Sequence, residues 1–201
     1  MPFDSQAEQD ALTLLSALVR LDTTNPPGHE RAAAELLAAS LREAGLEPQL
    51  LEKEPGRTNL VVRVKGDGSA GGPLLLSAQL DVPAARAEGA KHPPFSAEVD
   101  DGWLYGRGAA GPKSFAAAAA TVVRQLAREG TTLKRDLILV AAADTGAGGD
   151  LGARFLVDEH PELVRAEWGL CATGGHGVRL GEQRFYPVPV AHKGCCWISL
   201  K

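Results

Sequence analysis

The chain has 201 residues, of which 44% are hydrophobic and 23% charged, and its formal net charge is -4. This composition predicts a soluble globular protein of one sizeable domain, or of a domain and a fragment, and the lack of a basic cluster argues against nucleic acid as a partner. The longest apolar run, 115–123, is too short to cross a bilayer, and the N-terminus has no signal-peptide pattern. We therefore expect a cytoplasmic protein with no membrane partner.

The first third of the chain predicts two helices followed by two strands. Apolar residues recur at helical spacing from Ser5 onward, and the sequence Asn25-Pro26-Pro27 ends that helix because proline cannot continue it. Gly45 is placed to end the second helix. The expected helices are 5–21 and 29–44, and the expected strands are 47–52 and 59–65.

The rest of the chain predicts buried strands alternating with helices. Residues 74–80 are apolar on both faces, as expected for a central strand covered by helices. The turn Asp100-Asp101-Gly102 predicts a hairpin over 96–105. The further expected elements are helices 113–129 and 149–159 and strands 136–143, 168–172, 184–190 and 193–200, with 168–172 expected to be buried.

This order of elements predicts an α/β fold, a three-layer sandwich around a mixed, mostly parallel sheet. We expect the hairpin to make the sheet mixed. In such sheets ligands bind where strands end and helices begin, so the stretch 74–113 is the expected place of a site.

Six short segments, in this order along the chain, carry a resemblance to a known family. They are 22–28, 75–83, 92–95, 104–113, 144–153 and 191–194. Together they resemble the catalytic domain of M20 metallopeptidases and amidohydrolases, which include aminoacylase, carnosinase, succinyl-diaminopimelate desuccinylase and carboxypeptidase G. The resemblance implies a zinc-exopeptidase-like fold, with 1–190 as the catalytic-type scaffold and 191–201 as the start of a missing or truncated dimerisation domain.

The resemblance also implies a two-zinc site, and its positions can be read from the motifs. A zinc-binding histidine would stand at Gln79, two residues before Asp81, the aspartate that would orient it. The aspartate bridging the two metals would stand at Gly111. A glutamate pair, the general base and a zinc ligand, would stand at Thr145 and Gly146.

A further carboxylate ligand would stand at Ala172, or at Thr173 if the register slips by one. Zinc takes about four N, O or S ligands, and glycine and alanine side chains supply none. Threonine does not take up a proton near neutral pH as a general base must. We therefore expect a pseudoenzyme or binding scaffold without a competent metal site, and no cofactor. The alternative is an active zinc-dependent hydrolase of an acyl-amino acid or dipeptide that uses unrecognised ligands.

Several single residues keep more than one interpretation. Asp81 orients no histidine here and is expected to cap a helix or accept a backbone amide, and Asp144 is expected to shape its turn. Arg107 could bind a carboxylate, although a structural ion pair is the more ordinary role. His92, Cys171, His176 and His192 are candidates for a substitute metal site, and Ser77 or Ser114 for a hydrolase triad, without a supporting motif.

The expected partners are further copies of the chain or an intact paralogue. The apolar segment 195–200 would form an edge strand, and edge strands invite pairing.

Overall fold

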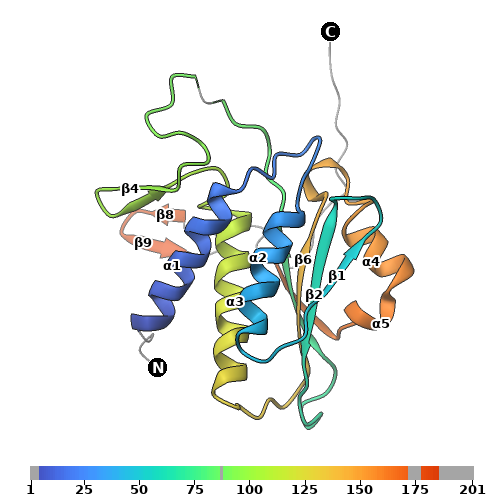
Figure 1. Cartoon of the computed structure of the whole chain (residues 1–201). Coiled ribbons are helices and arrows are strands. Elements are labelled where there is room, and N and C mark those ends of the chain that lie inside the picture. The colour runs from blue at the N-terminus through green and yellow to red at the C-terminus, as the bar shows by residue number, and fades with distance from the viewer. Residues whose placement is uncertain (1–4, 87, 172–177, 186–201) are drawn as a thin grey trace. The chain divides into compact units, whose positions relative to one another are not determined.

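The computed structural model describes residues 5–86, 88–171 and 178–185 (Figure 1). The chain divides into two compact units, residues 1–171 and 172–201. The first unit contains a five-stranded sheet and the helices that cover it. In the second unit, β8 (Val178–Leu180) and β9 (Gln183–Phe185) form an antiparallel hairpin.

The sheet of the first unit is mixed, as predicted. Its strand order is β1-β2-β6-β3-β7. β1 pairs with β2, and β2 with β6, in antiparallel fashion, whereas β3 runs parallel to both β6 and β7. The strands are β1 (Gln49–Glu52), β2 (Thr58–Val64), β3 (Leu74–Gln79), β6 (Leu137–Ala142) and β7 (Trp168–Cys171).

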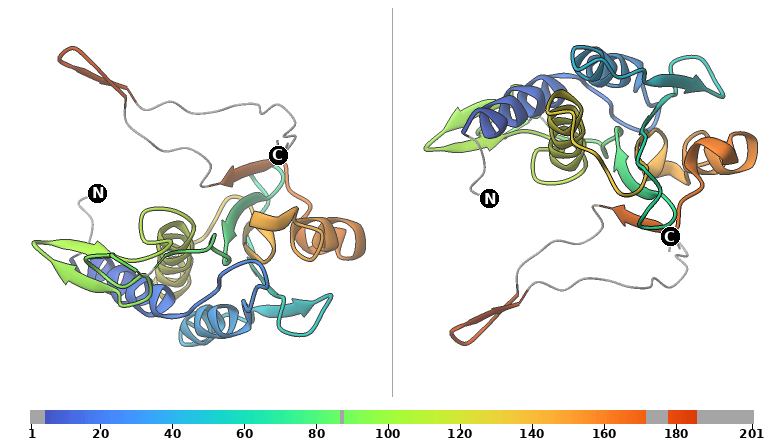
Figure 2. Two further views of the ribbon diagram at one scale, coloured as in Figure 1. Left: turned by 90° about the horizontal axis from the view of Figure 1, so that it is seen from above. Right: turned by 90° about the horizontal axis from the view of Figure 1, so that it is seen from below.

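Helices cover both faces of the sheet and complete the three layers (Figure 2). Because successive side chains of a strand point to opposite faces, Leu139 of β6 packs toward α1, α2 and α3, and Val140 packs with Phe155 of α4. The larger core lies on the side of the first three helices. The helices are α1 (Ser5–Arg20), α2 (Arg31–Arg42), α3 (Pro112–Arg128), α4 (Ala153–Glu159) and α5 (Pro161–Val164).

The predicted hairpin is confirmed, but it does not join the main sheet. β4 (Glu98–Asp100) and β5 (Trp103–Tyr105) form a two-stranded sheet of their own. Asp101 and Gly102 both have positive φ, 48° and 77°, as a two-residue hairpin turn requires. The main sheet is mixed because β2 runs antiparallel to β6, so the expected cause was wrong.

Two further predictions differ from the structure. The segment expected as one helix, 149–159, is helical only from Ala153, because glycines at 149 and 152 disfavour a helix in its first four residues. A 3-10 turn, η1 (Thr145–Ala147), precedes it. β7 was expected to be buried, but all four of its residues are exposed, since it is the outer strand of the described sheet.

The predicted strand 193–200 lies outside the described residues, as does most of 184–190. Within the described residues, no helix combines the length and the apolar character that a membrane span needs.

Candidate functional site

Two aspartates meet at one edge of the sheet. Asp81 follows the end of β3, and Asp144 follows the end of the parallel strand β6. The amide nitrogen of Asn25 donates to Asp81 Oδ2 at 2.9 Å and to Asp144 Oδ1 at 3.2 Å. Residues from three distant segments therefore converge where the strand order predicts a site.

The Asp81 carboxylate is buried and surrounded by donors. Besides Asn25, the backbone amides of Thr145 and Gly146 donate to it at 3.0 and 2.8 Å, and so does the Thr145 hydroxyl. Asp81 thus holds the first residues of η1, which is the capping role that was one interpretation of this residue. Its two oxygens are already used by protein donors.

Asp144 lies in the left-handed region, with φ 60°, and shapes the turn after β6 as predicted. Burial alone would raise the pKa of its carboxyl group. The backbone amide of Leu151, the amide of Asn25 and the Arg57 guanidinium outweigh that effect and hold the pKa below its usual range. Asp144 is therefore ionised and paired near neutral pH.

A buried ion pair supports this turn and was missed from the sequence. Arg57 donates two hydrogen bonds to the fully buried Glu30, at 2.8 and 2.9 Å, and a third to Asp144. The Asp144 amide donates to Glu30 at 3.3 Å. Glu30 and Arg57 are 27 residues apart with no motif around them, so nothing in a single sequence indicated this pair.

The positions implied for metal ligands fall at the same edge of the sheet. Gln79 is the last residue of β3, Gly111 precedes the first turn of α3, and Thr145 and Gly146 begin η1. Ala172 and its alternative Thr173 lie outside the described residues. The described set offers one amide and one hydroxyl, so these residues do not fit a zinc pair bridged by a carboxylate.

Lack of space does not explain why glycine stands at Gly111. A Cβ atom added there would meet no atom within 4 Å. By contrast, a Cβ on Gly106 would lie 2.2 Å from the Val19 side chain, and Gly108 has φ +90°. A Cβ on Gly146 would lie 3.2 Å from Asp81 Oδ2. Glycine is needed at 106 and 108, whereas an aspartate at 111 meets no steric barrier at its Cβ.

Of the four candidates for a substitute metal site, His92 and Cys171 lie within the described residues, and they do not form a metal-binding group there. His92 stacks on Tyr105, and Cys171 ends β7, while His176 and His192 lie outside the described residues. Across the described ranges, no three His, Cys, Asp or Glu side chains group as metal ligands would. Ser114 donates to the Gly111 carbonyl at 2.7 Å, a local bond within the first turn of α3.

Comparisons with known proteins identify the family of this chain. Residues 75–184 match the model of peptidase family M20/M25/M40. Aminoacylase-1 of Sus scrofa is 29% identical over 171 residues, which is 85% of this chain and 42% of that protein. Succinyl-diaminopimelate desuccinylase of Methylorubrum populi is 39% identical over 108 residues, 51% of this chain and 27% of that protein. The chain spans less than half the length of these curated relatives.

Solved structures share the fold. An M20 family metallo-carboxypeptidase from Sulfolobus solfataricus superposes with a TM-score of 0.71 at 18% identity, over 83% of this chain and 38% of that one. Human carnosine dipeptidase 1 superposes with a TM-score of 0.62 at 18% identity, over 84% of this chain and 38% of that one.

Proposed function

This chain belongs to peptidase family M20/M25/M40, and we propose that it is a non-hydrolytic member whose two-zinc site is lost. It acts as a binding or regulatory module, built on the catalytic-domain scaffold. The same proposal places the protein in the cytoplasm. Its partner there is a second copy of the chain or an intact paralogue.

One observation carries this proposal. At the position where active relatives are expected to hold a glutamate pair, Thr145 and Gly146 instead donate three hydrogen bonds to Asp81. A segment expected to supply a base and a metal ligand has become a set of donors to the one retained carboxylate. A threonine hydroxyl has no useful basicity near neutral pH, so water activation has no base here.

The tolerance at Gly111 supports the same interpretation. The fold leaves space for a side chain at this position, yet the residue carries no ligand atom. A clash with neighbouring atoms therefore does not account for the missing bridging carboxylate.

The direct test is metal content. The purified chain is incubated with zinc, passed through a desalting column and analysed by mass spectrometry. We expect no stoichiometric zinc. One or two tightly bound zinc ions per chain would overturn the proposal and support the alternative of an active hydrolase with unrecognised ligands.

Restoration variants separate the missing ligands from one another. Gln79→His alone should restore neither zinc binding nor hydrolysis of acyl-amino acids, because the bridging carboxylate is also absent. The combined variant Gln79→His, Gly111→Asp, Thr145→Glu and Gly146→Glu should gain zinc affinity over the single variant. Activity regained by Gln79→His alone would sink the ligand assignment.

A further inference from the structure

A pocket with a cationic lining lies apart from the strand-end positions. It has a volume of about 350 Å³ and lies between the loop after β3 and the turn after β5. Arg86, Lys91 and Arg107 line it together with His92 and Tyr105, and no acidic residue does. This imbalance of charge favours an anionic occupant.

Arg107 is the fixed element of this pocket. Its backbone amide donates to the Pro94 carbonyl at 2.7 Å, and its Nη2 donates to the Ala84 carbonyl at 2.9 Å. The Nε atom is buried and has no hydrogen-bond partner. A buried donor without an acceptor is unfavourable, and an oxyanion is the acceptor that a guanidinium fork fits best.

The structural ion pair expected for Arg107 is absent from the described part of the chain, where its one side-chain bond is to a carbonyl. Arg86 is exposed and has no ion pair within the described ranges either. Lys91 is 2.7 Å from Asp100, but both side chains are exposed, so this pair is weak. Arg86 and Arg107 are therefore available to a ligand, and Lys91 is held only by an exposed pair.

An aromatic wall completes the pocket. The His92 and Tyr105 rings stack at 3.9 Å. Two carboxylates of β4, Glu98 and Asp100, lie 3.0 and 3.5 Å from the two ring nitrogens of His92. The negative charges of β4 thus lie against His92 and are not part of the pocket lining.

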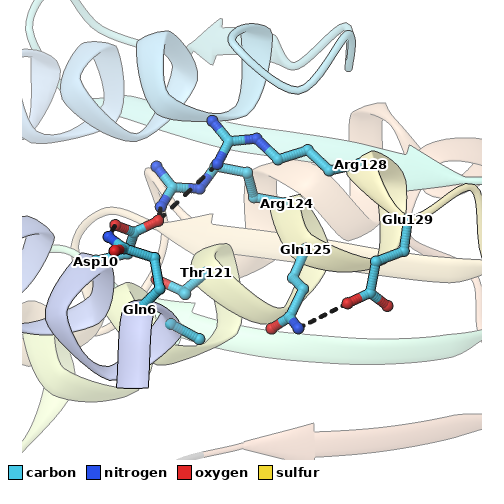
Figure 3. A pocket seen from close by; sticks show the side chains of 8 residues that line it. Gln6, Asp10, Thr121, Arg124, Gln125, Arg128 and Glu129 are labelled. Atoms are coloured by element: carbon cyan, nitrogen blue, oxygen red, sulfur yellow. Dashed lines mark hydrogen bonds and ion pairs between the residues drawn. The ribbon is translucent and has the colours of Figure 1, made fainter. Parts of the chain in front are cut away.

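Another pocket with arginines is a poorer candidate. It lies between α1 and α3 and has a volume of about 210 Å³ (Figure 3). Its arginines, Arg124 and Arg128, are accompanied by Asp10 and Glu129, and Arg124 already bonds to Asp10. An anion there would displace an existing pair.

We propose that the Arg107 pocket binds a compact oxyanion, a carboxylate or phosphate group, through the Arg107 fork with Arg86 and Lys91 at the rim. The pocket uses none of the implied metal-ligand positions, so this inference goes beyond the proposed function. A chain that bound zinc and also bound the oxyanion would overturn the first proposal only.

The test is isothermal titration of the full chain with inorganic phosphate and, separately, with acetate at constant ionic strength. We expect saturable binding of at least one of them, and the preferred one identifies the chemical class. Arg86→Gln should weaken it about tenfold, the loss of one charged hydrogen bond. Arg107→Gln should abolish it, and Arg154→Gln, an exposed arginine on α4, should leave it unchanged.

Arg86→Gln alters only an exposed side chain, so it tests the pocket even if the Arg107 variant unfolds. No saturable binding of either anion would overturn the inference. So would binding that is equal in wild type and in the folded Arg86 and Arg107 variants.

Discussion

At the scale of single residues, the buried acids of the strand-end edge are held by hydrogen bonds from the protein itself. Asp81 accepts hydrogen bonds from Asn25 and η1, and Glu30 accepts two from Arg57 and one from the Asp144 amide. A buried carboxylate is tolerated only when it is paired and hydrogen-bonded. Replacing one of these acids therefore destabilises the fold, because its buried donors lose their acceptor.

Glu30→Gln should lower the free energy of unfolding by about 2 kcal/mol, because Arg57 would lose the charged hydrogen bonds to Glu30 and keep only Asp144 as a charged partner. Urea unfolding followed by circular dichroism measures the change. Glu162→Gln, at an exposed position of α5, is the control and should change it by less than about 0.5 kcal/mol. A Glu30 variant as stable as wild type would contradict this account of the ion pair.

Lys113 is the other buried charge near this edge. It is 1% exposed, and its Nζ donates to the Leu18 and Leu21 carbonyls at 2.9 and 2.6 Å, at the C-terminal end of α1. Burial lowers its pKa from 10.5 to about 8, although Asp22 opposes the shift. The protonated form is therefore less stable in the folded chain than in the unfolded chain.

Between pH 8 and 10.5 the unfolded chain binds one more proton at Lys113 than the folded chain does, so this residue makes stability rise with pH. We expect the difference in free energy of unfolding between wild type and Lys113→Met to grow in favour of wild type, by up to about 2 kcal/mol, from pH 8 to 10. Denaturant titrations at several pH values measure it. Lys134→Met is the exposed control, and a difference independent of pH would contradict the prediction.

At the scale of elements, Arg124 of α3 ties the three helices of one layer together. It donates to Ser40 of α2 at 2.9 Å and to Asp10 of α1, and it is 9% exposed. Figure 3 shows the Asp10 contact beside the pocket. One side chain thereby fixes how these helices pack.

Asp10→Ala should destabilise the chain by about 2 kcal/mol, because Arg124 would keep its buried charge without the carboxylate. Thermal and urea unfolding measure the loss. The matched control is Asp150→Ala, whose partner Arg154 is 68% exposed, and its effect should stay below about 0.5 kcal/mol. Equal effects of the two variants would refute the role of Arg124.

Most elements were predictable because their signals are local. The apolar pattern of 74–80 and the turn residues at 100–102 act within a few residues, and the structure follows them. The exposure of β7 was not predictable, because an apolar strand has the same sequence pattern in the centre of a sheet and at its edge. In the site, the sequence motifs singled out Asp81 and Thr145 as candidate residues. The bridge made by Asn25, 56 residues away from Asp81, depends on the folded backbone.

At the scale of the whole molecule, β7 is the feature open to association. It is the outer strand of the described sheet, and Trp168 and Leu170 are 60% and 52% exposed. Both stand beside Leu74 and Leu76 of β3 in the strand register. An exposed apolar edge strand favours pairing with another chain.

We therefore expect a molar mass above that of the monomer in light scattering at high protein concentration. Leu170→Lys should shift it toward the monomer, because a charge on an edge strand opposes pairing. Val157→Lys, which replaces a 59% exposed apolar residue of α4, is the control for an added lysine elsewhere. A clean monomer of the wild type would count against the expected oligomer.

The bridge of Asn25 across Asp81 and Asp144 has a consequence for how the protein matures in a cell. The ends of β3 and β6 are fixed by an amide that is part of the chain itself. If the zinc site is lost as proposed, we expect the yield of folded protein to be the same in zinc-starved and zinc-replete cultures. On the same proposal, the protein would remain available when zinc is scarce.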